Sequence, residues 1–259
     1  MRFASKFLAT ALTLAMMQLT SQRSDAAETN VISGGAFKQV LTELAAAYEK
    51  ESGQKLALNF QTVGQHVAAI KDGKETFDVA ILTPEAIDGL IKDGKVVPGS
   101  RADLARVGIG VVVKAGAPLP DIATVEAFKR ALLAAKSVAY IDPAAGGSSG
   151  IYVARLLERL GITQQVNAKA KLVHGGAVAD YVADGEAELG VHQISEILPV
   201  PGVTLVGPLP DEIQNYTVYA AGVGTAAADA AAAQAFVKFL TGPHALPIIK
   251  AKGMQPAAS

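Results

Sequence analysis

The sequence predicts an α/β protein built as two lobes. Its 259 residues, of which 50% are hydrophobic and 18% charged, suffice for one large or two medium globular domains. Apolar, β-rich runs alternate with helical patterns along most of the chain, which is typical of parallel βαβ units with helices on both faces of a sheet. These units are too many for one ordinary sheet, and no low-complexity linker divides them. We therefore expect two lobes joined by more than one crossover of the chain.

The first elements follow from the spacing of apolar residues. A short strand at 31–32 leads into a turn of small residues. Apolar residues at positions 37, 40, 41, 44, 45 and 48 then give a helical period over 37–50, and Gly53 ends it. The next expected elements are a strand at 56–60, a helix at 64–70, a strand at 78–82 and a helix at 85–92.

The second part of the chain repeats this alternation. Thr124 is expected to cap a helix at 125–135, and Gly161 to end a helix at 151–160 that follows a loop at 142–150. The other expected strands lie at 107–113, 137–141, 171–173, 189–193, 204–206 and 216–223. The other expected helices lie at 177–183, 229–240 and 243–252.

Two extended apolar segments, at 107–114 and 216–224, are the places where we expect the chain to cross between lobes. This places residues 27–107 and 222–259 in lobe 1 and residues 108–221 in lobe 2. Residues 1–26 are expected to form a separate signal peptide, described next.

The N-terminus has the order of a secretory signal peptide. Arg2 and Lys6 precede an apolar run at 7–17, and a polar stretch then ends in Ala26-Ala27. The run is shorter than the roughly 20 apolar residues of a membrane anchor, and the chain has no cysteine to carry a lipid. We therefore expect cleavage near Ala26 and a periplasmic location.

Composition and motifs exclude several function classes. Because there are no cysteines, disulfides, cysteine-ligated metals and thiol nucleophiles are excluded. The four histidines are far apart, and 23 basic against 24 acidic residues leave no charge surplus for nucleic acid. The glycine-rich stretch at 146–150 lacks the Gly-Lys-Ser/Thr ending of a P-loop. We expect no metal, no cofactor and no nucleic acid, which leaves a small-molecule ligand.

Several short segments together carry a resemblance to a known family. They are Ser33-Gly34-Gly35, Gln61-Thr62-Val63-Gly64-Gln65, Phe77-Asp78-Val79-Ala80, the segment from Asp142-Pro143 to Gly150-Ile151-Tyr152, and the segment 183–190. In this order, over essentially the whole mature chain, the sequence resembles the type II periplasmic binding proteins of ABC importers, in the branch similar to the molybdate-binding protein. That branch also includes proteins that resemble aconitate isomerase.

The resemblance implies a two-lobed fold and an anionic ligand, but the chain departs from the molybdate binders. They usually have a Ser-rich second loop and a Tyr just after the late strand. Here the second loop is Thr62-Val63-Gly64, and the late strand continues into His192-Gln193. The sequence therefore leaves open whether the ligand is an oxyanion or a carboxylate.

The candidate site consists of loops expected at the carboxyl ends of strands, where helix starts present free N–H groups. The residues are Ser33, Gly34, Gly35, Thr62 and Val63 from one lobe, and Ser148, Ser149, Gly150, His192 and Gln193 from the other. Hydroxyls, glycines and helix starts can hold an anion without Lys or Arg. Taken singly, each loop is better explained by helix capping and chain turning, whereas three such loops converging on one cleft favour a binding site.

Two functions remain open. The first is a monomeric protein that captures a small anion between its lobes and delivers it to an ABC permease. The second is an isomerase on the same scaffold, which moves a proton and a double bond within a polycarboxylate. His192 is the candidate base in that case, with His66 and His174 as the other side chains that titrate near neutrality. The sequence identifies neither the anion nor a catalytic base.

Overall fold

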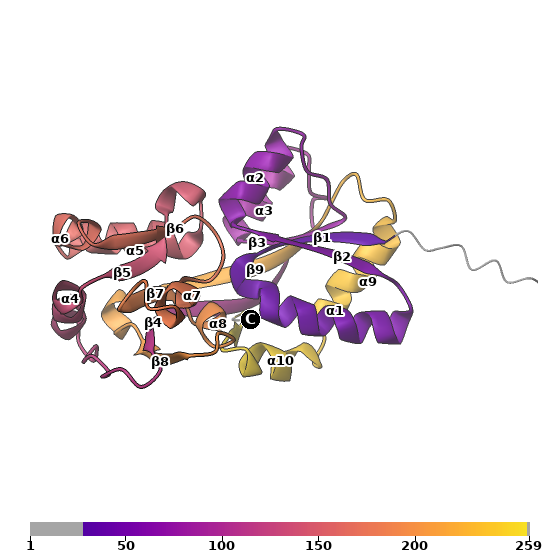
Figure 1. The fold of residues 1–259 in the computed structure, drawn as a ribbon. Coiled ribbons are helices and arrows are strands. Elements are labelled where there is room, and N and C mark those ends of the chain that lie inside the picture. The colour runs from indigo at the N-terminus through magenta and orange to yellow at the C-terminus, as the bar shows by residue number, and fades with distance from the viewer. Residues whose placement is uncertain (1–27, 258–259) are drawn as a thin grey trace, which may run out of the picture.

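The computed structural model describes residues 28–257 and confirms an α/β fold (Figure 1). The strands are β1 (Thr29–Gly34), β2 (Leu56–Gln61), β3 (Val79–Leu82), β4 (Ala102–Lys114), β5 (Val138–Ile141), β6 (Ala170–Val173), β7 (Leu189–Gln193), β8 (Val203–Pro208), β9 (Tyr216–Val223) and β10 (Gln255–Pro256). The α-helices are α1 (Lys38–Ser52), α2 (Val63–Lys71), α3 (Pro84–Lys92), α4 (Val125–Ala134), α5 (Ser148–Arg159), α6 (Thr163–Asn167), α7 (Val178–Ala183), α8 (Ile194–Ile197), α9 (Ala230–Leu240) and α10 (Ala245–Ala251). Three single 3₁₀ turns are η1 (Gly35–Phe37), η2 (Pro143–Ala145) and η3 (Asp211–Ile213).

The strands form two sheets that share the long strand β4. In the first, which we call the β1 sheet, the order is β2-β1-β3-β9-β4, with β10 also paired to β4. In the second, the β5 sheet, the order is β4-β7-β5-β6, with β8 also paired to β4. Residues 102–108 of β4 pair with β9, whereas residues 109–114 pair with β7 and β8. The chain therefore passes from one sheet to the other within β4, and it is back in the β1 sheet at β9.

The sheets are mixed, whereas the sequence pattern predicted parallel βαβ units. The pairs β1–β2, β1–β3, β5–β6 and β5–β7 are parallel as expected. Both β4 and β9 pair antiparallel with their neighbours. The reason lies in the path of the chain. Strand β4 leads away from the β1 sheet and β9 returns to it, so the two run in opposite directions side by side.

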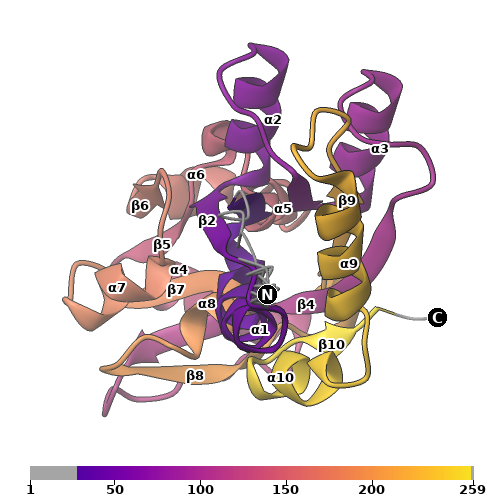
Figure 2. The ribbon, with the colours of Figure 1, turned by 90° about the vertical axis from the view of Figure 1, so that its right-hand side faces the viewer.

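Helices cover both faces of each sheet, as predicted. On the β1 sheet, α1, α9 and α10 pack on one core, and α2 and α3 pack on another. Figure 2 shows α2 and α3 at the top of the molecule and α1 with α10 at the bottom. On the β5 sheet, α4, α5 and α6 share one core, and α7 and α8 share the other. Each sheet thus has its own apolar interior.

Some predictions are not decided by this arrangement. The predicted lobe boundary at 221–222 falls inside β9, which pairs within the β1 sheet over its whole length. The assignment of lobes, including their crossovers, stays a prediction. The predicted signal peptide at 1–26 lies outside the described residues. No helix within residues 28–257 is long and apolar enough to span a membrane.

Candidate functional site

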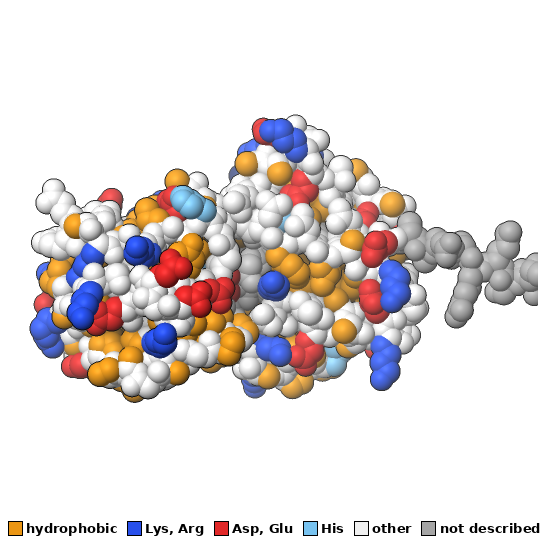
Figure 3. Space-filling view, viewed as in Figure 1, with side chains coloured by type: hydrophobic (Ala, Val, Ile, Leu, Met, Phe, Trp, Pro, Cys, Tyr) orange, Lys and Arg blue, Asp and Glu red, His pale blue; other side chains and the backbone are white. Residues whose placement is uncertain are grey.

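A cavity of about 520 Å³ lies where loops from the two sheets meet. Its wall includes residues at the ends of β1, β2, β5 and β7 or shortly after the ends of these strands and of β6. These are the carboxyl ends of the parallel strands, where α/β proteins bind ligands. Figure 3 shows the surface indented between the two halves of the molecule. The position of the cavity therefore follows from the strand directions.

The cavity brings together seven of the ten residues that the sequence singles out. They are Gly35, Thr62, Val63, Ser148, Ser149, His192 and Gln193. The other three, Ser33, Gly34 and Gly150, are not part of its wall. Ser33 is fully buried, and its hydroxyl donates to the carbonyl of Gly34.

Gly34 and Gly150 permit close packing behind the wall. A Cβ at Gly34 would lie 2.7 Å from Cε1 of Tyr219, which real side chains do not tolerate. A Cβ at Gly150 would collide with the carbonyl oxygen of Ile141 at the end of β5. Glycine at these two positions lets neighbouring elements pack closely. Gly34 and Gly150 therefore support the wall without lining the cavity.

Thr62 both starts α2 and contacts the other half of the molecule. Its side chain accepts a hydrogen bond from Gln65 N–H, and the Gln65 side chain accepts from Thr62 N–H, which forms a capping box. The Thr62 hydroxyl also donates to the carbonyl of Ala145 in η2. Its donor is therefore already in use within the protein.

The start of α5 has donors to offer. Its N-cap residue is Gly147, and no side chain caps the helix. The Ser148 hydroxyl accepts from the side chain of Gln193 at 3.1 Å. Ser149 is 3% exposed, and within residues 28–257 its hydroxyl has no hydrogen-bond partner although it lies in the wall. An anion at this point would meet a free hydroxyl and the N–H groups of a helix start.

His192 and Glu196 form a pair in the wall. His192 ends up on β7 and Glu196 on the first turn of α8, with Nε2 and Oε2 3.2 Å apart. His192 is 1% exposed, and its Nδ1 has no hydrogen-bond partner in the described part of the chain. Burial lowers the pKa of His192 to about 3. Burial raises the pKa of Glu196 to about 8, an effect that the charge of Lys38 opposes. Both side chains are therefore neutral at pH 7.

Three further side chains set the charge of the cavity. Lys38, in the first turn of α1, is the one Lys or Arg among the described residues of the wall. Asp180 of α7 is a further acidic residue of the wall, in addition to Glu196. Tyr219 of β9 is buried, which raises its pKa well above the usual range, so it stays a neutral phenol. Its hydroxyl lies 3.5 Å from Oε1 of Gln193.

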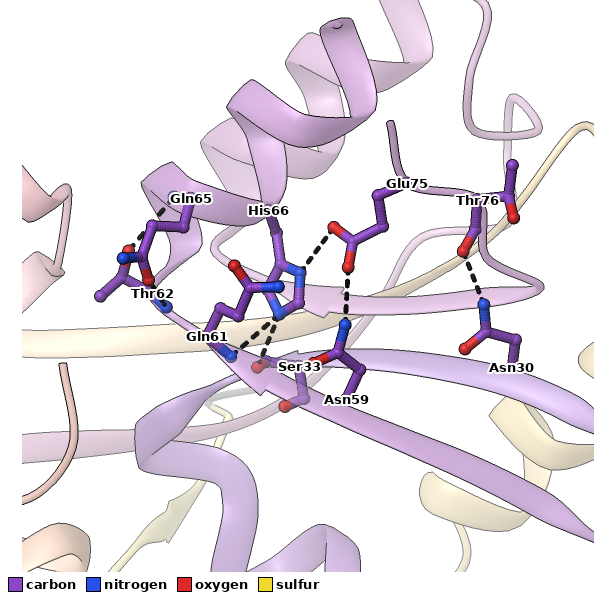
Figure 4. A network of polar contacts seen from close by, with 9 residues as sticks. All are labelled: Asn30, Ser33, Asn59, Gln61, Thr62, Gln65, His66, Glu75 and Thr76. Carbon is purple, nitrogen blue, oxygen red and sulfur yellow. Dashed lines mark hydrogen bonds and ion pairs between the residues drawn. The ribbon is translucent and has the colours of Figure 1, made fainter. Parts of the chain in front are cut away.

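His66 lies beneath the wall, although the sequence allowed it a place in the cleft. It is 0% exposed, and Nδ1–H donates to Glu75 Oε2 at 2.8 Å. Nε2 lies 3.1 Å from both the Gln61 N–H and the Ser33 carbonyl oxygen. Figure 4 shows the ring beside Ser33 of β1 and Gln61 of β2, with the Asn59 side chain donating to the other carboxyl oxygen of Glu75. His66 thus connects the ends of β1 and β2.

The other two histidines are at the surface. The side chain of His174 is 81% exposed and pairs with Asp142. His244 is exposed, and its ring lies tilted against that of Phe239, with the ring centroids 4.1 Å apart. Neither is part of the cavity wall.

Sequence reasoning missed Glu196, Lys38 and Tyr219 as residues of the site. Glu196 is mostly enclosed, with 17% of its side chain exposed. The one sequence feature that could have indicated its role is its position four residues after His192. This spacing brings the two side chains together only because β7 continues directly into α8. Lys38 and Tyr219 carry no local motif, because the sheet order brings them to the cavity.

Residues 29–255 match the bacterial extracellular solute-binding protein family. The chain belongs to this family. Among curated members of related sequence, it is 36% identical over 231 residues to a protein named aconitate isomerase from a Pseudomonas species, covering 87% of each chain.

The solute-binding protein is also similar to molybdate-binding proteins. It is 31% identical over 270 residues to the molybdate-binding protein ModA of Azotobacter vinelandii, covering 98% of each chain. A solved structure of the periplasmic molybdate-binding protein of the same species superposes with a TM-score of 0.73 at 23% identity, covering 90% of this chain and 100% of that one. The resemblance inferred from sequence is thereby confirmed.

Proposed function

We propose that this solute-binding protein captures a small organic anion with carboxylate groups in the cavity. The observation that carries the proposal is the wall itself. It combines a free hydroxyl and an uncapped helix start at α5 with a single lysine, Lys38. Such donors hold an anion by dipoles and hydrogen bonds, with little fixed charge to neutralise.

The size of the cavity favours a carboxylate over a tetrahedral oxyanion. A volume of about 520 Å³ is in the range of pockets for molecules of several carbon atoms, about 300–1,000 Å³. Of the two named relatives, one is named for molybdate and the other for aconitate, a tricarboxylate. The chain is 31% identical to the first and 36% identical to the second. This supports a di- or tricarboxylate as the ligand.

The wider setting is part of the proposal. We place residues 27–107 and 222–259 in one lobe and 108–221 in the other, with the lobes closing on the ligand. The signal sequence and the family support export to the periplasm. There the protein would act as a monomer that delivers its ligand to an ABC permease.

The proposal is tested by a thermal-shift screen of residues 27–259. The ligands are succinate, citrate, cis-aconitate and trans-aconitate, with molybdate and sulfate as oxyanions. A carboxylate present at 100 times its Kd should stabilise the protein by about 2.7 kcal/mol. A shift with molybdate alone, or with no carboxylate, would contradict the proposal.

Ser149→Ala tests the placement of the site. Removing a hydroxyl that donates to a charged ligand should cost about 1.5–3 kcal/mol, which weakens binding roughly ten- to a hundredfold in calorimetry. Ser52→Ala is the matched control, since Ser52 ends α1 and its hydroxyl donates to the carbonyl of Tyr48 outside the cavity. Equal affinity of Ser149→Ala and wild type would show that the anion binds elsewhere.

A second candidate function is the isomerisation of aconitate. The buried His192–Glu196 pair and the identity to the named aconitate isomerase favour it. The reaction needs a base to remove a proton from the CH₂ group, a shift of the double bond, and return of a proton to the former vinyl carbon. In its ionised form Glu196 is the stronger base of the pair, because the pKa of His192 is near 3 and that of Glu196 near 8.

The two functions separate in one experiment. Wild-type protein is incubated with cis-aconitate in D₂O and followed by NMR. Interconversion of isomers, lost in Glu196→Gln while thermal protection by the ligand remains, would identify an isomerase. Unchanged cis-aconitate over hours, together with ligand protection, is the result expected of a protein that only binds.

A further inference from the structure

The surroundings of Glu196 disfavour its ionised form in a cavity that is proposed to bind an anion. Its side chain is 17% exposed and lines the cavity. Within residues 28–257, His192 is its one ion-pair partner, at 3.2 Å. Its other oxygen, Oε1, lies against the backbone of Gly35, where a Cβ would approach to 2.7 Å. The carboxyl group is thus held between His192 and the Gly35 backbone, and the charge of Lys38 is the one positive charge in the described part of the chain that acts on its pKa.

His192 does not supply that charge. It is enclosed, and the buried ring resists protonation because a charged imidazolium would lose its hydration. Nδ1 has no partner among the described residues, so the single ring proton is best placed on Nε2, where it donates to Glu196 Oε2. Oε2 then acts as an acceptor, and Oε1 is the oxygen that can carry a proton.

The titratable groups that line the cavity with Glu196 come from four other elements. They are His192 on β7, Lys38 on α1, Tyr219 on β9 and Asp180 on α7. Tyr219 is a neutral phenol, and Asp180 is a second carboxyl group of the same wall. Lys38 lowers the pKa of Glu196, yet burial is the larger effect and the pKa stays near 8. A bound anion raises it further, because like charges disfavour ionisation.

We propose that Glu196 enters the ligand complex as a neutral carboxylic acid and donates a hydrogen bond to the bound carboxylate, so that ligand binding takes up a proton at alkaline pH, where the free protein has lost it. This rests on the proposed function and deepens it. An acid and a carboxylate that share one proton form a short, charge-assisted hydrogen bond. The site would therefore prefer carboxylates, which accept such a bond, and would release them as the pH rises.

The test is the pH dependence of binding of succinate and trans-aconitate, measured by calorimetry from pH 6.5 to 9.5. Both ligands keep their full charge over this range. For wild type, Kd should be constant up to about pH 7.5 and rise about tenfold per pH unit above pH 8. At pH 9, calorimetry in two buffers of different ionisation enthalpy should detect the uptake of about one proton per ligand.

Two variants make the result specific. Glu196→Gln keeps a neutral donor of the same shape, so it should bind within tenfold of wild type at pH 6.5, with a flat pH profile and no proton uptake. Asp180→Asn removes a different carboxyl group from the same wall and should keep the wild-type pH slope. Tight binding by wild type with no slope and no proton uptake would overturn this inference and leave the proposed function standing. Failure of every carboxylate to bind at pH 6.5 would overturn both.

Discussion

At the scale of single residues, His192 and Glu196 make opposite contributions to stability. The pKa of His192 falls from its ordinary value of 6.5 to about 3, so the folded state binds fewer protons than the unfolded state between those values. Its contribution is present above pH 6.5 and is lost as the pH falls toward 3. The pKa of Glu196 rises from 4.5 to about 8, so its contribution is present below pH 4.5 and is lost as the pH rises toward 8.

These opposite slopes predict a plateau of stability between pH 4.5 and 6.5 from this pair. From pH 6.5 to 8 the loss due to Glu196 should amount to about 2 kcal/mol, at about 1.4 kcal/mol per pH unit. Urea denaturation at several pH values checks this without any ligand. The difference between wild type and Glu196→Gln isolates the group, since all other titrations cancel. A difference that does not change between pH 6.5 and 8 would show that Glu196 is ionised in the folded protein.

At the scale of elements, the contacts of His66 predict that the ends of β1 and β2 are both held in place by one imidazole ring. With Nδ1–H donating to Glu75, the neutral ring leaves Nε2 to accept from Gln61 N–H beside the Ser33 carbonyl. His66→Ala would leave these groups buried and unpaired and should cost about 2–4 kcal/mol in urea denaturation. The matched control is His174→Ala, which removes an exposed ion pair with Asp142 and should cost less than about 1 kcal/mol. Similar losses in both variants would contradict a supporting role for His66.

The sequence predicted correctly the helices of several turns and the buried strands. The helix expected at 37–50 is α1, Lys38–Ser52, and the strand expected at 189–193 is β7. It failed where an element is too short to show a period, as in α6, α8 and β10, which have five, four and two residues. This failure matters for the site, because α8 is the element that turns Glu196 toward His192.

The start of α5 shows a second physical limit. The sequence placed Ser148, Ser149 and Gly150 in a loop, since such residues favour turns over helix interiors. In the structure they form the first turn of the helix, after the N-cap Gly147. Helix packing against the end of β5 outweighs local preference there, and that contact is visible only in three dimensions.

At the scale of the whole molecule, two glycines hold the halves together beside the cavity. Gly64 at the start of α2 donates its N–H to the carbonyl of Gly146 at 3.1 Å. A Cβ on either residue would lie 2.7 Å from the Cα of the other. The start of α2 and the η2–α5 loop therefore meet backbone to backbone. If the halves close on the ligand as proposed, this contact forms as they close.

Gly64→Ala should prop the halves apart without damaging either interior. Gly64 has no positive φ, so alanine is compatible with its backbone, and the added methyl group meets only the opposing loop. We expect a weaker ligand affinity, by about tenfold or more, since overpacking costs about 1–3 kcal/mol that closure has to overcome. The melting temperature of the free protein should change little, while the radius of gyration of the ligand-bound form in X-ray scattering increases. Gly89→Ala in α3, where a Cβ meets nothing within 4 Å, is the control and should bind as wild type does. Wild-type affinity and size in Gly64→Ala would show that the two loops do not need to touch for the ligand to be held.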